Sequence, residues 1–320
     1  MFKISSNDEF NTLALRIFKY QAKHNKVYAS YLKNLNIDID EIIQINDIPF
    51  LPIEFFKSHD VILDGLNPEI IFTSSGTTGS VQSRHLVSDL SIYEQSFIKA
   101  FEHFFGSPEE YCILALLPNY LEREGSSLVY MAEKLIKLSK HAASNFYLHN
   151  IDELAKKINS QELQNKKIIL LGVTYALLDL AENHKINHPE LIIMETGGMK
   201  GKRKEMIREE LHQVLATKLN VDKIYSEYGM TELLSQAYSV GDGIFKCPPW
   251  MKILIRDTND PLSLLDNNKG GGINIIDLAN INSCSFLMTQ DLGKVSADGS
   301  FEVLGRFDAS DIRGCNLLVQ

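Results

Sequence analysis

A run of small hydroxyl residues and glycines at residues 74–79, Ser-Ser-Gly-Thr-Thr-Gly, has the composition of an anion-binding loop. It follows the apolar run Ile-Ile-Phe at residues 70–72, so we expect it where a strand ends. Glycines permit a tight turn that brings backbone N–H groups close to an anion, and the neighbouring hydroxyl groups add donors. This chemistry suits a polyphosphate, although most short runs of this composition are solvated turns. The loop by itself leaves both interpretations open.

Four further segments place glycines, carboxylates or an aromatic ring at the end of an apolar run. They are residues 195–201 (Glu-Thr-Gly-Gly-Met-Lys-Gly), 227–232 (Glu-Tyr-Gly-Met-Thr-Glu), 289–293 (Thr-Gln-Asp-Leu-Gly) and 305–308 (Gly-Arg-Phe-Asp). The first lets a flat ring approach the main chain, and the second combines a ring that can stack on a base with a carboxylate able to hold Mg²⁺. The carboxylate of Asp291 could bind ribose hydroxyls. Taken singly, each segment could equally be a turn or a capped helix start.

The elements that must position these segments alternate between strands and helices. We expect strands at residues 111–117, 144–148, 167–172, 190–195 and 222–225. We expect helices at residues 89–105, 126–141, 151–163, 174–184 and 202–219. Such alternation predicts a mainly parallel sheet with flanking helices, a fold in which ligands bind at the carboxyl ends of the strands.

The two ends of the chain have different patterns. Residues 1–68 are expected to be mostly helical, with helices at 10–22 and 38–45. Turns that include residues 268–272 separate short strands expected at 251–256, 273–277, 284–288, 293–297 and 300–304. The predicted fold class is therefore α/β, with a smaller antiparallel or barrel-like β subdomain. The expected domains are an α/β nucleotide-binding core at 1–240, a β-rich subdomain at 241–308 and a tail at 309–320.

Composition argues against several classes of function. The 320 residues carry a formal net charge of −9 and contain no basic patch with interleaved aromatic residues, so nucleic acid is not an expected partner. The most apolar stretch, residues 167–181, is too short to span a bilayer and contains Asp179. No apolar leader precedes the first helix, so a cytoplasmic protein is expected. The four cysteines do not have metal-ligand spacing.

In their order and spacing, the five segments together resemble the adenylate-forming superfamily of acyl- and aryl-CoA ligases, firefly-type luciferases and peptide-synthetase adenylation domains. Within that superfamily the closest resemblance is to the acyl-protein synthetase of the bacterial bioluminescence fatty-acid reductase complex. The resemblance extends over about residues 45–317. The stretches that carry it are residues 71–79, 195–198, 228–232, 272–280, 291–293 and 305–315.

The resemblance implies an AMP-forming acid–thiol ligase. A fatty or similar carboxylic acid would attack the α-phosphate of ATP in the presence of Mg²⁺, giving acyl-AMP and pyrophosphate, and a thiol would then take the acyl group. Gly197 and Gly198 with Tyr228 would face adenine, next to Gly229. The phosphates would be cradled by the first loop, namely by Ser74, Ser75, Gly76, Thr77, Thr78 and Gly79.

The resemblance also implies catalytic and positioning roles for four side chains. Thr231 would contact the α-phosphate, and Glu232 would hold Mg²⁺. Asp291 would bind the ribose hydroxyls, and Arg306 would lie near the ribose or a phosphate at the hinge-like residues 305–308. Positioning and charge neutralisation around the phosphorus would then supply most of the catalysis.

Two departures from the superfamily pattern affect these expectations. The phosphate loop usually continues into a lysine, but here it continues as Ser-Val-Gln-Ser-Arg-His at residues 80–85, so a cation would come from Arg84 or from elsewhere. The sequence ends shortly after residue 308, where adenylating enzymes usually have a mobile domain of ~100 residues that supplies a catalytic lysine. We therefore expect the large-domain fold without the usual carboxyl-terminal domain.

Cys315 is the expected acyl acceptor. The synthetases that this chain resembles have a cysteine near the carboxyl terminus that accepts the acyl group as a thioester, and Arg313-Gly314-Cys315 matches that position. The neighbouring Arg313 would favour the thiolate, whereas the alternative is an inert terminal thiol. An acyl reductase or acyl carrier protein would be the next partner. Two other interpretations stay open: a truncated ligase that loads CoA or a carrier protein, and a non-catalytic nucleotide- or acyl-binding module in a biosynthetic complex.

Overall fold

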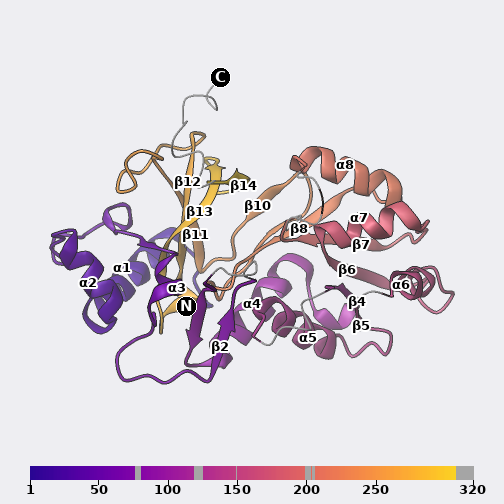
Figure 1. Ribbon diagram of the computed structural model, residues 1–320, viewed down its shortest axis with the longest axis horizontal. Helices are drawn as coiled ribbons and strands as arrows, with labels where there is room; N and C mark the ends of the chain where they lie inside the picture. Colours follow the sequence, from indigo (N-terminus) through magenta and orange to yellow (C-terminus); the bar gives the residue numbers. More distant parts are fainter. Residues whose placement is uncertain (76–80, 119–124, 149, 199–202, 204–205, 308–320) are drawn as a thin grey trace. The chain divides into compact units, whose positions relative to one another are not determined.

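A computed structural model of the chain describes residues 1–75, 81–118, 125–148, 150–198, 203 and 206–307 (Figure 1). The chain forms two compact units, which are described separately. The first, called here the α/β unit, is Pro68–Pro248. The second, called here the β unit, combines Met1–Asn67 with Pro249–Gln320. The predicted mixed α/β fold class is confirmed.

The α/β unit contains the predicted parallel sheet. Its strand order is β10-β9-β8-β7-β6-β4-β5, in which β4 to β8 are parallel and β8, β9 and β10 pair antiparallel. All residues of β4 are buried, as are those of β6 after Lys167, which explains their continuous apolar runs. The strands are β4 (Tyr111–Leu116), β5 (Asn145–Tyr147), β6 (Lys167–Val173), β7 (Leu191–Thr196), β8 (Ile224–Tyr228), β9 (Ala237–Ser239) and β10 (Ile244–Lys246).

Helices cover both faces of this sheet. In Figure 1, α7 and α8 lie on one face and α4 and α5 on the other. Side-chain caps fix two of the helix starts, because Asp89 accepts from the N–H of Ser91 and Ser126 accepts from the N–H of Val129. The predicted helix at 202–219 starts later than expected, at Arg208. The helices are α4 (Leu90–Phe105), α5 (Ser127–Ser139), α6 (Ile151–Ile158), α7 (Thr174–Asn183) and α8 (Arg208–Leu219).

A two-stranded hairpin precedes the sheet of the α/β unit. It pairs β2 (Ile70–Thr73) with β3 (Arg84–Val87), with Thr73 opposite Arg84. The ring of Phe72 is buried and packs edge-on against Tyr93 of α4, with ring centroids 5.3 Å apart. The hairpin therefore fixes both ends of the predicted phosphate loop.

The amino-terminal part of the β unit is helical, as predicted, but its second helix is elsewhere. The elements are the helices α1 (Asn7–His24), α2 (Lys26–Asn34) and α3 (Phe55–Ser58), the 3-10 helix η1 (Ile45–Asp47) and the strand β1 (Leu51–Pro52). The helix predicted at 38–45 is wrong. Asp38 instead accepts from the backbone N–H of Asp40, a local bond that competes with a helix. Asn25 accepts from the N–H groups of Val27 and Tyr28 and so starts α2, which was not predicted.

The strands of the β unit form an antiparallel sheet in the order β11-β12-β13-β14, with β1 parallel to β13. They are β11 (Met251–Arg256), β12 (Gly270–Asp277), β13 (Phe286–Val295) and β14 (Phe301–Arg306). The two strands predicted at 284–288 and 293–297 are one strand, β13, which carries a register shift between Leu292 and Gly293. The turn predicted at 268–272 was also wrong in part, because β12 already starts at Gly270.

Residues 1–67 pack on the carboxyl-terminal strands of the β unit. The side-chain amide of Gln21 donates to the backbone oxygens of Asn280 and Ile281, and its oxygen accepts from the N–H of Ser285. Phe18 packs edge-on against Phe286. The bounds of the two units therefore differ from the division expected at residue 240, and the division into folding domains stays a prediction.

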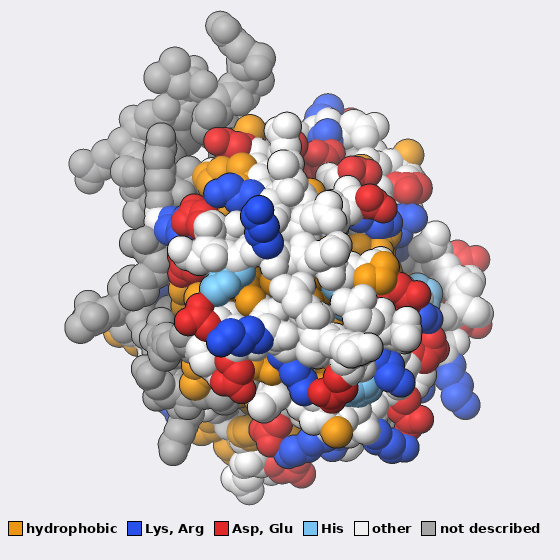
Figure 2. All heavy atoms as spheres, turned by 90° about the vertical axis from the view of Figure 1, so that its right-hand side faces the viewer, with side chains coloured by type: hydrophobic (Ala, Val, Ile, Leu, Met, Phe, Trp, Pro, Cys, Tyr) orange, Lys and Arg blue, Asp and Glu red, His pale blue; other side chains and the backbone are white. Residues whose placement is uncertain are grey.

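Charges of both signs are mixed on the face shown in Figure 2. Lys and Arg side chains lie among Asp and Glu side chains over most of this face, and hydrophobic side chains form small separate groups. This face therefore presents no large field of one sign. Within the described part of the chain, no helix is both long enough and apolar enough to cross a membrane.

Replacing Gly271 by alanine is expected to lower the free energy of unfolding by about 3 kcal/mol. A Cβ atom there would lie 2.3 Å from the backbone oxygen of Arg256, which cannot move without disturbing the β11–β12 pairing. Urea unfolding followed by circular dichroism measures the effect. The matched control is Gly270→Ala, whose Cβ would meet only Leu304 Cδ1 at 3.8 Å, and it should change stability by less than about 0.5 kcal/mol. Equal effects would contradict the steric argument.

Candidate functional site

Two of the predicted segments lie side by side at the carboxyl edge of the α/β unit's sheet. Strands β7 and β8 are parallel neighbours, with Thr196 opposite Glu227. Gly197 and Gly198 follow the end of β7, and Tyr228 is the last residue of β8. The two stretches expected to face adenine therefore leave the sheet from adjacent strands.

A buried hydrogen bond ties these two strand ends together. The hydroxyl of Thr196 donates to Oε2 of Glu227 over 2.5 Å, and both side chains are buried. The other carboxylate oxygen of Glu227 faces Gly229, where a Cβ atom would lie 2.4 Å from it. Gly229 is thus required by close packing. The ring of Tyr228 contacts Phe245 edge-on, with centroids 5.9 Å apart.

The residue before Thr196 anchors a second buried network that the sequence analysis did not find. Glu195 Oε1 lies 3.5 Å from both Arg208 Nη1 and His212 Nε2 of α8, and its Oε2 accepts from the hydroxyl of Thr174. Burial alone would raise the pKa of Glu195, but the hydrogen bond from His212 and the charge of Arg208 hold it below its usual value. The sequence did contain a pattern that indicates this network. An acidic residue lies at the end of a strand, and two basic residues lie four positions apart on the next helix.

The turn after β8 carries Thr231 and Glu232 and is anchored on the hairpin. Nδ1 of His85 on β3 donates to the backbone oxygen of Thr231 over 2.8 Å. Glu232 is buried, with an exposed fraction of 6%. The hairpin that carries the phosphate loop is therefore bonded directly to the turn that carries the expected metal ligand.

The start of the phosphate loop has a defined structure. Ser74 closes the hairpin, because its hydroxyl accepts from the N–H of Ser83 over 2.9 Å and its own N–H donates to the Ser83 oxygen. Ser75 is exposed. Gly76, Thr77, Thr78 and Gly79 lie outside the described residues.

Asp291 and Arg306 are brought together in the β unit. They lie opposite one another on β13 and β14, and Arg306 Nε is 3.4 Å from Asp291 Oδ1. Asp291 was expected to end a strand but lies within β13, next to its register shift. Arg306 also donates to the side-chain oxygen of Gln290. Cys315 lies outside the described residues.

The carboxylate of Glu232 is the kind of oxygen ligand with which proteins hold Mg²⁺ beside a nucleotide. Among the residues that the structure describes, no group of three or more His, Cys, Asp or Glu side chains could form a complete metal cage. Mg²⁺ is commonly bound by one or two carboxylates together with substrate phosphates. The buried carboxylate of Glu232 can supply such a ligand, with the phosphates of ATP supplying the others.

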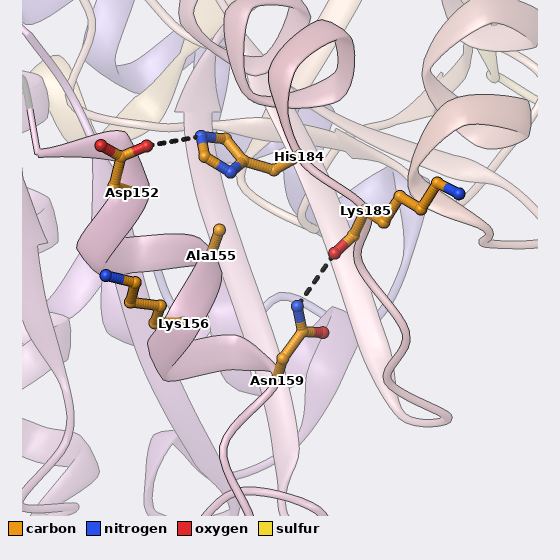
Figure 3. Close-up of a pocket in the computed structure, with 6 residues that line it drawn as sticks. All are labelled: Asp152, Ala155, Lys156, Asn159, His184 and Lys185. Carbon is orange, nitrogen blue, oxygen red and sulfur yellow. Dashed lines mark hydrogen bonds and ion pairs between the residues drawn. The ribbon is translucent and has the colours of Figure 1, made fainter.

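A surface depression of about 540 Å³ lies elsewhere in the α/β unit, between α6 and the segment after α7 (Figure 3). At its edge Asp152 Oδ1 lies 3.1 Å from Nε2 of His184, and the side chain of Asn159 donates to the backbone oxygen of Lys185. None of the predicted site residues lines it. It therefore belongs to no part of the candidate site.

The Glu227 carboxyl should make stability depend on pH. Burial raises its pKa to about 7, the hydrogen bond from Thr196 lowers it and the charge of Glu195 raises it. Because the ordinary value is 4.5, the folded protein holds a proton between pH 4.5 and 7 that the unfolded chain has released. This contribution to stability is complete below pH 4.5 and is lost as the pH rises through 7. The loss is at most about 3 kcal/mol.

Glu227→Gln tests this expectation, because glutamine keeps the shape and can still accept from Thr196. Urea unfolding of both proteins at pH 5 and at pH 8 measures the difference. Wild type should lose stability relative to the variant between these values. Parallel pH profiles would contradict the assignment to Glu227.

Comparisons with known proteins agree with this architecture. The family described as acyl-protein synthetase, LuxE, matches residues 4–320. A search of curated proteins found no significant match. A 2-hydroxyisobutyryl-CoA ligase, solved with 2-HIB-AMP and CoA, is 12% identical with a TM-score of 0.71, covering 95% of this chain and 70% of the ligase. ATP-bound MatB from Rhodopseudomonas palustris is 17% identical with a TM-score of 0.53, covering 74% of this chain.

The chain spans 47% of the length of MatB, and both similarities concern the fold. They confirm the predicted adenylate-forming architecture. The family match covers almost the whole sequence and confirms the predicted relationship. The chain therefore belongs to the LuxE acyl-protein synthetase family.

Proposed function

We propose that this protein uses ATP to activate a fatty or similar carboxylic acid as acyl-AMP and then transfers the acyl group to a protein thiol, Cys315. An oxygen of the acid forms a bond to the α-phosphorus, and the bond from that phosphorus to the bridging oxygen breaks, which releases pyrophosphate. The thiolate then attacks the acyl carbonyl, the bond to the AMP oxygen breaks, and a thioester and AMP result. The expected setting is the cytoplasm, and the expected later partner is an acyl reductase or carrier protein.

One observation carries the proposal. Within the α/β unit, the stretches proposed to face adenine leave adjacent strands, and the turn with Thr231 and Glu232 is hydrogen-bonded to the hairpin that starts the proposed phosphate loop. Segments up to about 150 residues apart in the sequence are thereby joined through the pairs and contacts that a nucleotide site needs. Neighbouring folds solved with ATP or with an acyl-AMP support the same reaction class.

Each predicted residue has a defined part in the proposed reaction. Ser74 and Ser75 with the rest of the loop donate to phosphate oxygens, and Tyr228 stacks on adenine beside Gly197 and Gly198. Thr231 donates to the α-phosphate, where charge develops. Glu232 would hold Mg²⁺, which when bound would neutralise charge on the phosphates.

Two residues of the β unit, Asp291 and Arg306, also have proposed parts in ATP binding. Asp291 is proposed to bind the ribose hydroxyls. Arg306 is proposed to lie against the ribose or a phosphate. Their 3.4 Å ion pair keeps the carboxylate and the guanidinium in the same place on β13 and β14.

Acid-dependent ATP–pyrophosphate exchange, measured with acids of increasing chain length and with or without CoA, tests the proposal. Exchange together with an acyl mass adduct on the intact protein, removable by hydroxylamine, is the expected result. Formation of acyl-CoA without an adduct would favour a CoA ligase. ATP binding without exchange for any acid would favour the non-catalytic binding module and overturn the proposal.

A further inference from the structure

The β unit contains a buried arginine that connects several strands. Arg256 ends β11 and has an exposed fraction of 5%. Its guanidinium donates to the backbone oxygen of Ile273 over 2.8 Å, to Oδ1 of Asn274 over 3.0 Å and to the backbone oxygen of Thr289 over 2.6 Å. Gly272 leaves the space that the guanidinium fills, since a Cβ there would lie 2.4 Å from Cζ. One side chain thus joins β11, β12 and β13.

The acceptors of Arg256 are neutral, although its group is a cation. Burial lowers the pKa of Arg256 to about 10, while the charges of Glu54 and Asp291 oppose that shift, so the group stays protonated at neutral pH. A buried cation without a directly bonded carboxylate is costly, and neutral donors would suffice merely to join strands. Electrostatic interactions with nearby groups are therefore needed to offset the cost of burying this charge.

The ring of Phe307 is a further electrostatic partner, in addition to the charges of Glu54 and Asp291. The Arg256 Cζ atom lies over it, 5.5 Å from the ring centroid, within the range of cation–π attraction. The N–H of Phe307 donates to the backbone oxygen of Gln290 over 2.8 Å. Phe307 is therefore held from two sides, by Arg256 through its ring and by β13 through its backbone.

This contact fixes the residue that follows Arg306 and the strand that carries Asp291. Arg306 donates to Gln290 over 3.2 Å, and Gln290 in turn is hydrogen-bonded to Glu54. The N–H of Asp291 donates to the hydroxyl of Thr289, whose backbone oxygen binds Arg256. Asp291 is thus linked to the buried guanidinium through Thr289, and Arg306 is linked to it through its chain neighbour Phe307.

We propose that Arg256 and Phe307 are a pair of positioning residues that holds Asp291 and Arg306 in place for the ribose of ATP. The inference rests on the proposed function, because it assigns the ribose to Asp291. Neither residue touches the nucleotide. Each acts through the two side chains that do.

The test uses Phe307→Leu and Phe307→Ile, which remove the ring and keep an apolar side chain. The readout is KM for ATP and for 2′-deoxy-ATP in acid-dependent exchange. Wild type should prefer ATP, because the deoxy analogue lacks one ribose hydroxyl. In both variants KM for ATP should rise about tenfold, the scale of a desolvated cation–π contact. The preference for ATP over the analogue should shrink, while kcat changes little.

Two controls make the outcome decisive. Phe307→Tyr keeps a π face and should restore wild-type KM and preference. Leu304→Ala removes an exposed apolar side chain from β14, the strand that ends just before Phe307, and should leave both unchanged. A wild-type preference for ATP in both Phe307→Leu and Phe307→Ile would overturn the positioning role. Absence of exchange in wild type would instead overturn the proposed function.

Discussion

Replacement of Glu232 by glutamine is expected to lower acid-dependent ATP–pyrophosphate exchange by about 100- to 1,000-fold. The substitution keeps the size and the hydrogen-bonding oxygen of the side chain but removes the negative charge that is proposed to bind Mg²⁺. Glu232 is buried, and the turn that carries it is held by the hydrogen bond from His85 to the backbone oxygen of Thr231. The loss should therefore concern metal-dependent chemistry and leave the fold intact.

A Mg²⁺ titration separates this role from a general structural defect. The Glu232→Gln protein should need a higher Mg²⁺ concentration for half-maximal exchange, while its urea midpoint stays close to that of wild type. Glu210→Gln, an exposed charge change on α8, is the matched control and should leave exchange unchanged. Unchanged exchange in Glu232→Gln at limiting Mg²⁺ would remove Glu232 from the metal site.

The parallel strands could be predicted because burial on both faces leaves a local mark. Continuous apolar runs such as that of β4 result from packing against helices on both sides, and helix caps such as Asp89 are visible one residue at a time. The errors in the predicted strand bounds arose where tertiary contacts determine where a strand ends. A register shift beside Asp291 lets β13 continue through polar residues that looked like a break between two strands.

The individual segments of the candidate site could also be predicted, because their residue types suit nucleotide chemistry wherever they lie. The hydrogen bonds and packing contacts that hold these segments in place could not be predicted. The Thr196–Glu227 bond joins residues 31 apart in sequence, and it exists only because β7 and β8 pair in one register. Arg256 looked like an ordinary strand residue, and only the glycine opposite it, Gly272, reveals that a large side chain fills the space between strands.

The structural role of a glycine also could not be predicted from the sequence. The run at residues 268–272 was interpreted as a turn because glycine favours turns. In the structure Gly271 and Gly272 lie within β12, where close approach of Arg256 excludes a side chain. A glycine required for flexibility and a glycine required for space are identical in sequence. Only the packing partner distinguishes them.

Replacement of Cys315 by serine is expected to spare exchange and abolish the covalent acyl adduct. Adenylation precedes the thiol step and does not involve the sulfur, whereas a serine hydroxyl is a far weaker nucleophile than a thiolate at neutral pH. Two of the described cysteines, Cys112 and Cys284, are poor substitutes for Cys315. Burial raises the pKa of Cys284 to about 12 and also raises that of Cys112, so neither is a ready thiolate. Exchange and intact-mass measurements on the same preparation provide both readouts.

Cys247→Ser is the matched control, because Cys247 is the remaining cysteine and is half-buried. It should keep both exchange and adduct. An adduct that persists in Cys315→Ser but disappears in Cys247→Ser would move the acceptor to residue 247. Equal loss of exchange in Cys315→Ser and Glu232→Gln would contradict the assignment of the two residues to different steps. A residue that only accepts the acyl group cannot be needed to make the acyl-AMP. The two variants therefore separate the activation step from the transfer step without any assumption about the length of the acid.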